Sequence, residues 1–233
     1  MDYVWAVLTV LAAYVIGSIP WGFIIGKFNG VDIRTVGSRN IGATNVTRCV
    51  GKAAGKLCFA LDFIKGVIPV LAAQWFFRDW RYLEYVVILA LFAVVLGHMF
   101  PVFLKFKGGK GVSTAAGAII ALTPLPLLIA LVVWVVVFLV SRYVSLASIS
   151  AAVVLPVVAW VFYITRTGGH KLAHSPIVLV FLTLVAVLAI IRHRSNIQRL
   201  LDGTENRFGK KVPEKPSDEA SSDDKLSSDD SAK

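Results

Sequence analysis

Residues Tyr85–Leu104 read YVVILALFAVVLGHMFPVFL, a stretch without an acidic residue, a lysine or an arginine. An α-helix needs about 20 consecutive apolar residues to cross the hydrocarbon core of a bilayer, and this stretch has that length. Similar runs lie on both sides of it, and 57% of the chain is hydrophobic while only 16% is charged, unlike a soluble domain. The sequence therefore predicts an all-α integral membrane protein, with apolar segments at Tyr3–Ile25, Leu57–Phe77, Tyr85–Leu104, Val112–Thr123, Leu125–Val140, Val144–Ile164 and Ile177–Ile191.

The distribution of basic residues decides how many of these segments cross the membrane. Only Val112–Thr123 leaves the number open, because it is short and Pro124 and Pro126 break the helix after it. Seven crossings with an extracytoplasmic N-terminus place 16 basic residues on the cytoplasmic side and four on the other, as the positive-inside rule requires. Six crossings would separate the last basic group from the first two. The sequence predicts seven transmembrane helices, an extracytoplasmic N-terminus and a cytoplasmic C-terminus.

Composition divides the chain into a basic body and an acidic tail. Residues 1–211 are predicted to form one membrane domain, and the acidic, serine-rich residues 212–233 a disordered cytoplasmic tail. Up to Val212 the chain holds 21 basic and seven acidic residues, an excess that suits membrane lipids with anionic headgroups and phosphorylated ligands. Nucleic acid is not expected as a partner, because the basic residues lie between the apolar segments. Neither Cys49 nor Cys58 has the companions of a metal site, so no metal is expected.

The first polar segment, Gly37–Arg48, reads GSRNIGATNVTR and contains no acidic residue. Gly37 and Gly42 let the backbone turn and approach a ligand closely. A loop of this kind that leads into a helix can surround an anion with backbone N–H groups and cationic side chains. The alternative is a solvated loop at the membrane boundary, where arginine is common.

The second polar segment, Lys105–Gly111, reads KFKGGKG and opens the short fourth helix. Lysines and glycines before a helix N-terminus favour a phosphate site. It is not a Walker P-loop, because Gly111 occupies the position after the lysine where that motif requires Ser or Thr. The alternative is a basic loop that binds lipid headgroups.

The third polar segment, His193–Glu205, reads HRSNIQRLLDGTE. If the last helix continues through it, His193 and Asn196 share a face with Arg199 nearby, which brings an imidazole, an amide and a guanidinium to the membrane edge. Arg and His also end many membrane helices for no catalytic reason. With seven crossings, all three polar segments emerge on the same face and can form one site.

Other residues of note are the ionisable residues inside the apolar segments and two pairs of glycines. Asp62 and Lys65 share a helix face, so they either pair with each other or belong to a functional site. His98 is expected to be a packed, hydrogen-bonded histidine. The glycine pairs Gly22/Gly26 and Gly51/Gly55 predict close helix packing.

Together the three segments resemble the signature motifs of the bacterial acyl-phosphate:glycerol-3-phosphate acyltransferases (the PlsY type), in the same order and over Val15 to about Gly209. The chain has no Gly-x-Ser-x-Gly elbow and no His-Glu-x-x-His motif that would indicate other chemistry. The resemblance implies a multi-pass enzyme of the bacterial inner membrane, with its active site facing the cytoplasm and no cofactor. It implies transfer of an acyl chain from acyl phosphate to the 1-position of sn-glycerol 3-phosphate, which yields lysophosphatidic acid and phosphate in the first step of phospholipid synthesis.

The resemblance also implies the roles of individual residues. Arg48 and Lys110 would neutralise phosphate, Ser38 would orient a reactant, and His193 and Asn196 would position the attacking hydroxyl; the general base is either His193 or the leaving phosphate. The expected substrate-binding and phosphate-binding residues are Asn40, Gly42, Thr44, Asn45, Lys107, Gly108, Gly109, Gly111 and Glu205.

The alternative function is a transporter or flippase for a phosphorylated metabolite or lipid. Such a protein is expected to have a site at the midplane of the membrane and internal repeats. The sequence shows no clear repeat, and its polar segments cluster at one face.

Overall fold

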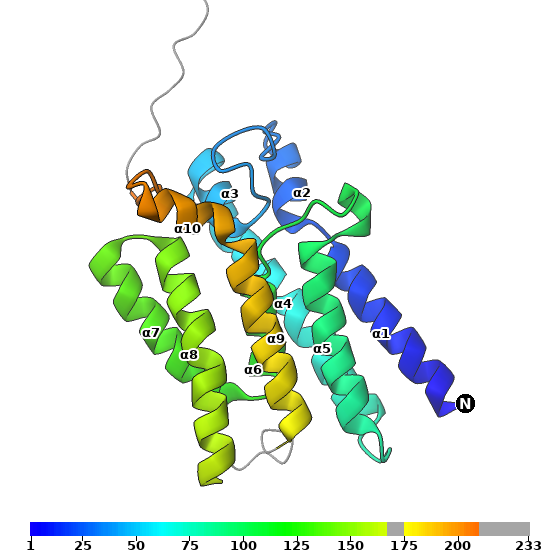
Figure 1. Cartoon of the computed structure of the whole chain (residues 1–233). Coiled ribbons are helices and arrows are strands. Elements are labelled where there is room, and N and C mark those ends of the chain that lie inside the picture. Colours follow the sequence, from blue (N-terminus) through cyan, green and yellow to red (C-terminus); the bar gives the residue numbers. More distant parts are fainter. Residues whose placement is uncertain (167–174, 210–233) are drawn as a thin grey trace, which may run out of the picture.

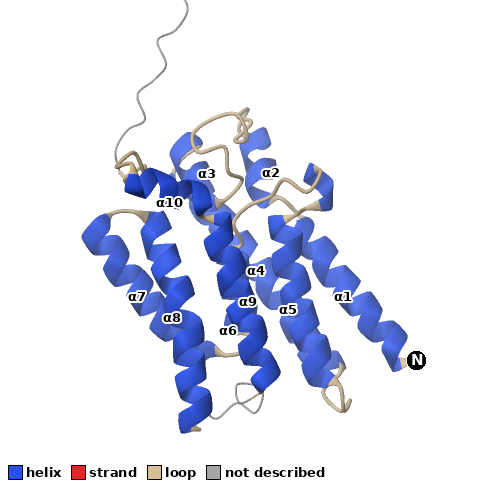
Figure 2. Cartoon of the chain, in the orientation of Figure 1, coloured by secondary structure: helices blue, strands red, loops and turns tan. Residues whose placement is uncertain are grey.

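The structure is a computed structural model that describes residues 1–166 and 175–209. Within these residues the chain is helical and contains no strand, so the all-α prediction is confirmed for this part of the chain (Figures 1 and 2). The helices are α1 (Asp2–Ser18), α2 (Trp21–Phe28), α3 (Ala43–Cys49), α4 (Lys52–Phe76), α5 (Leu83–Met99), the 3-10 helix η1 (Val102–Leu104), α6 (Val112–Ile120), α7 (Pro124–Ser141), α8 (Val144–Thr165), α9 (Pro176–Arg192) and α10 (Arg194–Leu201).

Length and hydropathy identify the helices that can cross a membrane. In the described residues five segments qualify, and α9 with α10 makes a sixth candidate that is bent by 54°. The five are Asp2–Phe28, Lys52–Phe76, Leu83–Leu104, Pro124–Ser141 and Val144–Thr165.

The fourth apolar segment is shorter than predicted. The helix α6 has nine residues and ends at Ile120, and Pro124 then starts α7, where proline is well tolerated. At a rise of 1.5 Å per residue, α6 covers only about 14 Å of a core that is about 30 Å thick.

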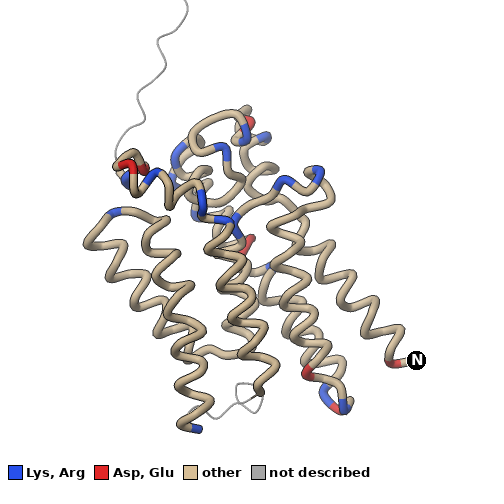
Figure 3. The backbone as a smooth tube through the Cα atoms, viewed as in Figure 1, with Lys and Arg blue, Asp and Glu red and all other residues tan. Residues whose placement is uncertain are grey.

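The long helices form a bundle with the N-terminus at one end and α10 at the other (Figure 1). The short helices α2, α3 and α10 and the loops that precede α3 and α6 gather at the end opposite the N-terminus. Figure 3 shows most lysines and arginines at that same end. The predicted convergence of the three polar segments is therefore observed. Lys171, Lys210, Lys211 and the predicted tail lie outside the described residues.

The core is centred on α5. In its candidate span 67% of the residues are buried, against 11% in that of α7, so α5 is enclosed by other helices while α7 faces the lipid. The end of the described chain is also packed, because the Phe208 N–H donates to the Arg142 carbonyl oxygen at 2.9 Å. The Phe208 ring lies edge-on to Phe138 of α7, with 5.5 Å between the ring centroids.

Glycines allow the closest helix contacts. A Cβ atom at Gly97 of α5 would lie 2.2 Å from the Tyr14 carbonyl oxygen of α1, and one at Gly117 of α6 would lie 2.0 Å from the Phe63 carbonyl oxygen of α4. These pairs of backbones approach each other only because the side chain is absent.

The predicted glycine pairs have a mixed outcome. A Cβ at Gly22 would lie 1.9 Å from the Ile41 carbonyl oxygen, one at Gly26 2.7 Å from the Val31 carbonyl oxygen, and one at Gly55 1.8 Å from Thr47 Oγ1. Their close packing is confirmed, although the partners lie in α3 and loops. The prediction is wrong for Gly51, which has open space around it and precedes α4 with a φ of +141°.

Replacing Gly117 with alanine is expected to lower the free energy of unfolding by about 1–3 kcal/mol, because the backbones of α4 and α6 must separate. Thermal unfolding in detergent, followed by circular dichroism, measures the change. The control is Ala60→Val on the exposed face of α4, which is expected to change stability by less than about 0.5 kcal/mol. Equal unfolding midpoints for the two variants would contradict the prediction.

Candidate active site

The second and third polar segments are joined by a chain of hydrogen bonds at the end of the bundle. Lys110 Nζ, before α6, donates to Asn196 Oδ1 in α10. Asn196 Nδ2 in turn donates to Glu205 Oε1 at 2.7 Å. The Glu205 carboxylate also accepts from Ser145 Oγ of α8 at 2.7 Å and from Arg199 Nε of α10 at 2.8 Å. The second and third segments thus form one network, fastened to α8.

Glu205 is a charged acceptor that orients Asn196. Burial alone would raise the pKa of Glu205, but the hydrogen bonds from Asn196, Ser145 and Arg199 lower it below its ordinary value. A carboxylate only accepts hydrogen bonds, so the amide nitrogen of Asn196 must face Glu205 and its oxygen must face Lys110. Lys110 is therefore held by an amide whose orientation is fixed from the other side.

Lys110 lies in a cationic environment. Burial lowers its pKa to about 8; Glu205 opposes this shift, whereas the charges of Arg199, Arg192 and Arg48 add to it. An anion bound among these cations would be attracted by all of them.

His193 lies at the break between α9 and α10. It is 3% exposed, and its Nδ1 lies 2.7 Å from the Ala189 carbonyl oxygen. Because a carbonyl oxygen only accepts, Nδ1 carries the proton and Nε2 keeps its lone pair. The charge of Lys110 acts on His193, so the two side chains are neighbours. The last helix does not continue straight through this segment: the 54° bend lays α10 across the end of the bundle (Figure 1).

The glycine loop, defined as Lys107–Gly111, is held by α5 and α9. Arg192 donates to the Gly108 carbonyl oxygen at 2.9 Å and to the Gly109 carbonyl oxygen at 2.9 and 3.2 Å. A Cβ at Gly109 would lie 2.2 Å from His98 Nε2, so a larger residue does not fit. Gly111 ends the loop with a φ of +80° at the start of α6, and Lys107 is exposed.

Asn45 organises the first polar segment. It is 1% exposed; its Nδ2 donates to the Ile33 and Val36 carbonyl oxygens at 2.9 and 3.2 Å, and its Oδ1 accepts from the Ser38 N–H at 2.8 Å. Both amide hydrogens are used, so Asn45 stabilises the loop and has no donor left for a ligand. A contact between Asn45 and a ligand stays a prediction.

The other residues of the first polar segment differ in their burial and in their distance from Lys110. The Asn40 Oδ1 accepts from the Gly42 N–H at 2.9 Å, just before α3. Arg48 of α3 is half-buried and is near enough to Lys110 to lower its pKa, whereas Ser38 is exposed and Thr44 half-buried. Of the predicted catalytic residues, the structure therefore brings together Arg48, Lys110, His193 and Asn196, and it leaves Ser38 at the edge.

Comparison with known proteins identifies the chain. A family model described as glycerol-3-phosphate acyltransferase matches residues 7–203. The chain belongs to the glycerol-3-phosphate acyltransferase family. The predicted enzyme class, an acyltransferase, and its place in phospholipid synthesis are thereby confirmed, and the transporter alternative loses its basis.

Relatives named glycerol-3-phosphate acyltransferase match almost from end to end. The protein from Desulforamulus reducens is 44% identical, over 91% of this chain and 99% of its own length. That from Aquifex aeolicus is 47% identical, over 87% of this chain and 99% of its own length. A crystal structure of PlsY (YgiH), an integral membrane glycerol 3-phosphate acyltransferase, in its glycerol 3-phosphate form has a TM-score of 0.78 and 46% identity, over 88% of this chain and 96% of that one. Its lysophosphatidic acid form has a TM-score of 0.75 and 45% identity, over 88% and 95% of the two chains.

Two residues of this candidate site were not selected from the sequence. Ser145 lies in the first turn of α8, and its only signal was a hydroxyl at the start of an apolar segment close to Arg142. Arg192 was counted only as one basic residue of the cytoplasmic face. Both act through contacts with residues far away in the sequence, which a motif does not reveal.

Proposed function

We propose that this acyltransferase moves an acyl chain from acyl phosphate to the 1-hydroxyl of sn-glycerol 3-phosphate, at the cytoplasmic face of the bacterial inner membrane. The products are lysophosphatidic acid and inorganic phosphate. The observation that carries the proposal is the position of Lys110: it is bound to Asn196 and surrounded by arginines at one end of a membrane bundle. The named ligands of the related PlsY structures, glycerol 3-phosphate and lysophosphatidic acid, support the acceptor and the product.

The reaction needs no covalent enzyme intermediate, because acyl phosphate is already activated. The glycerol hydroxyl oxygen forms a bond to the acyl carbon, and the bond from that carbon to the phosphate oxygen breaks. Phosphate leaves with the electron pair, and the hydroxyl proton passes to His193 Nε2 or to the leaving phosphate. The enzyme contributes position and charge: Lys110 and Arg48 neutralise phosphate, and the amide of Asn196 fixes the lysine.

The donor is tested by comparing palmitoyl phosphate, palmitoyl-CoA and palmitoyl-acyl carrier protein with the purified protein and glycerol 3-phosphate. The expected result is lysophosphatidic acid from palmitoyl phosphate alone, with phosphate release that depends on glycerol 3-phosphate. Equal turnover with a thioester donor would contradict the proposal.

The proposed topology has seven crossings with an extracytoplasmic N-terminus, and α6 is the short one. The gathering of lysine and arginine residues at the end of the bundle opposite the N-terminus supports it (Figure 3). A membrane-impermeant maleimide should label Asp79→Cys in intact cells and Lys105→Cys only after permeabilisation, with the unchanged chain as the background. Labelling of both in intact cells would reject this orientation.

The pKa of Lys110 predicts a pH dependence. Its pKa is lowered to about 8, so the charged form is present below that pH and is lost as the pH rises through it. Above pH 8, kcat/KM for glycerol 3-phosphate is expected to fall by about tenfold per pH unit, because kcat/KM reports the free enzyme. Bound phosphate favours the charged lysine, so the corresponding fall in kcat is expected at a higher pH. Steady-state kinetics between pH 6 and 10 measure both profiles, and identical midpoints would contradict the assignment.

A further inference from the structure

We propose that His98, which lies beside the buried pair Asp62 and Lys65, is a positioning residue that fixes the glycine loop and, through it, Lys110. This inference rests on the proposed function. It concerns a polar cluster inside the bundle that the proposed chemistry does not use.

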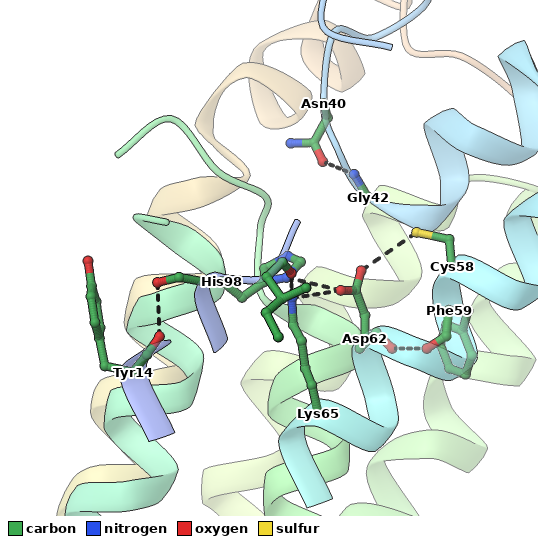
Figure 4. A network of polar contacts seen from close by, with 11 residues as sticks. Tyr14, Asn40, Gly42, Cys58, Phe59, Asp62, Lys65 and His98 are labelled. Carbon is green, nitrogen blue, oxygen red and sulfur yellow. Dashed lines mark hydrogen bonds and ion pairs between the residues drawn. The ribbon is translucent and has the colours of Figure 1, made fainter. Parts of the chain in front are cut away.

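The cluster is buried and connects three parts of the bundle (Figure 4). Asp62, Lys65 and His98 are 2%, 4% and 5% exposed. Lys65 Nζ lies 2.8 Å from Asp62 Oδ1, so the pairing that was one of the two readings is observed, and it donates to the Ile19 carbonyl oxygen at 2.8 Å. His98 Nδ1 lies 3.5 Å from the same Asp62 oxygen. The cluster thus links the break between α1 and α2 with α4 and α5.

Stability alone does not explain such a cluster. Taking two charges out of water costs free energy that their attraction often fails to recover, and well-packed apolar residues of similar size are commonly as stable or more stable. The presence of the buried ion pair is therefore explained by its contacts with neighbouring residues.

The pair lies beside His98, and His98 contacts the glycine loop. The Gly109 N–H donates to the His98 carbonyl oxygen at 3.1 Å. A Cβ at Gly109 would lie 2.2 Å from His98 Nε2, and one at Gly108 would lie 2.3 Å from the His98 carbonyl oxygen. The loop therefore rests directly on the backbone and ring of His98, while Arg192 binds the carbonyl oxygens of the same two glycines.

The position of the loop sets the position of Lys110. Lys110 follows Gly109 directly, and its amine must reach Asn196 Oδ1. A displacement of about 1 Å at a reacting centre can lower the rate about 100-fold. Asp62 lies 3.5 Å from the other side of the His98 ring, so the ring is packed between this carboxylate and Gly109.

Two variants and a control test the proposal. His98→Phe keeps a ring under the loop but cannot contact Asp62, and it leaves the ion pair intact. The double variant Asp62→Leu/Lys65→Met removes both charges together, so no unpaired charge remains. The control is Gln74→Met, which removes a hydrogen bond from α4 to the Ala121 carbonyl oxygen, away from the glycine loop.

The first readout is turnover compared with stability. Both test variants are expected to lower kcat/KM by about 10- to 100-fold. The double variant is expected to unfold at a temperature no lower than that of the unchanged protein. Gln74→Met is expected to keep kcat/KM within about threefold, since its lost hydrogen bond contributes only to stability. Test variants that are as active as Gln74→Met would overturn the proposal.

The second readout does not need catalysis. Amide hydrogen exchange over Lys107–Gly111 is expected to be at least about tenfold faster in both test variants than in Gln74→Met, because the loop opens more often. Unchanged exchange would overturn the positioning role even if activity were lost. An unchanged protein that lacks acyltransfer, combined with faster loop exchange in the variants, would reject the proposed function and leave His98 as the support of the loop.

Discussion

Replacing Lys110 with methionine is expected to lower kcat/KM for acylation of glycerol 3-phosphate by about 100- to 1,000-fold, the loss typical of a group that stabilises transition-state charge. Methionine has a similar length, so it removes the ammonium without opening a large cavity. The reason for so large an effect is that Lys110 is aimed at the site by Asn196 and lies among three arginines. Phosphate release from palmitoyl phosphate in detergent micelles measures it.

The matched control is Lys105→Met, in the same loop region but exposed. An exposed charge contributes at most about 1 kcal/mol, so this variant is expected to keep turnover within about fivefold. If Lys110→Met retained more than a tenth of the activity, the lysine would not contact phosphate in the transition state.

Replacing Glu205 with glutamine is expected to give the second-largest effect, a fall in kcat of about 10- to 100-fold, because orientation of the reacting groups is lost. The carboxylate accepts from Asn196, Ser145 and Arg199. Glutamine has one acceptor oxygen and places an amino group where an acceptor is needed. Leaving a partly buried donor unsatisfied costs about 1–3 kcal/mol, so the thermal midpoint should fall as well.

Two comparisons separate the charge of Glu205 from its hydrogen bonds. Ser145→Ala removes one neutral donor and keeps the carboxylate, so the free energy of unfolding is expected to fall by about 0.5–1.5 kcal/mol. Glu205 raises the pKa of Lys110, so in Glu205→Gln the alkaline fall in kcat/KM should begin at a lower pH than in the unchanged protein. If Glu205→Gln lowered kcat and the thermal midpoint no more than Ser145→Ala does, and left the pH profile of kcat/KM in place, the proposed role of the Glu205 carboxylate would be contradicted.

The sequence predicted the helical class and the convergence of the polar segments because both follow from local signals. Apolar runs of membrane length predict helices, and the basic residues between them predict a shared face. The pairing of Asp62 with Lys65 was one of two readings, and their three-residue spacing on a helix allowed it.

Other features depend on contacts between distant parts of the chain. The bend at His193 has no proline or glycine to indicate it, so the sequence left open whether the last helix continues. Asn45 looked like a ligand-binding amide, yet the fold turns it inward to hold Ile33 and Val36. Ser145 gains its meaning only because Glu205, 60 residues later, comes to lie beside it.

The anchoring of Phe208 also determines where another protein can be fused to this one. Its backbone bond to Arg142 and its ring contact with Phe138 pull the segment after α10 onto the α7–α8 turn, with Glu205 just before it. A fluorescent reporter or affinity tag joined after Gly209 leaves these contacts in place. The same tag joined at Asp202 would end the chain before Glu205. The bundle would still insert into the membrane, but it would lack the Glu205 carboxylate and be inactive.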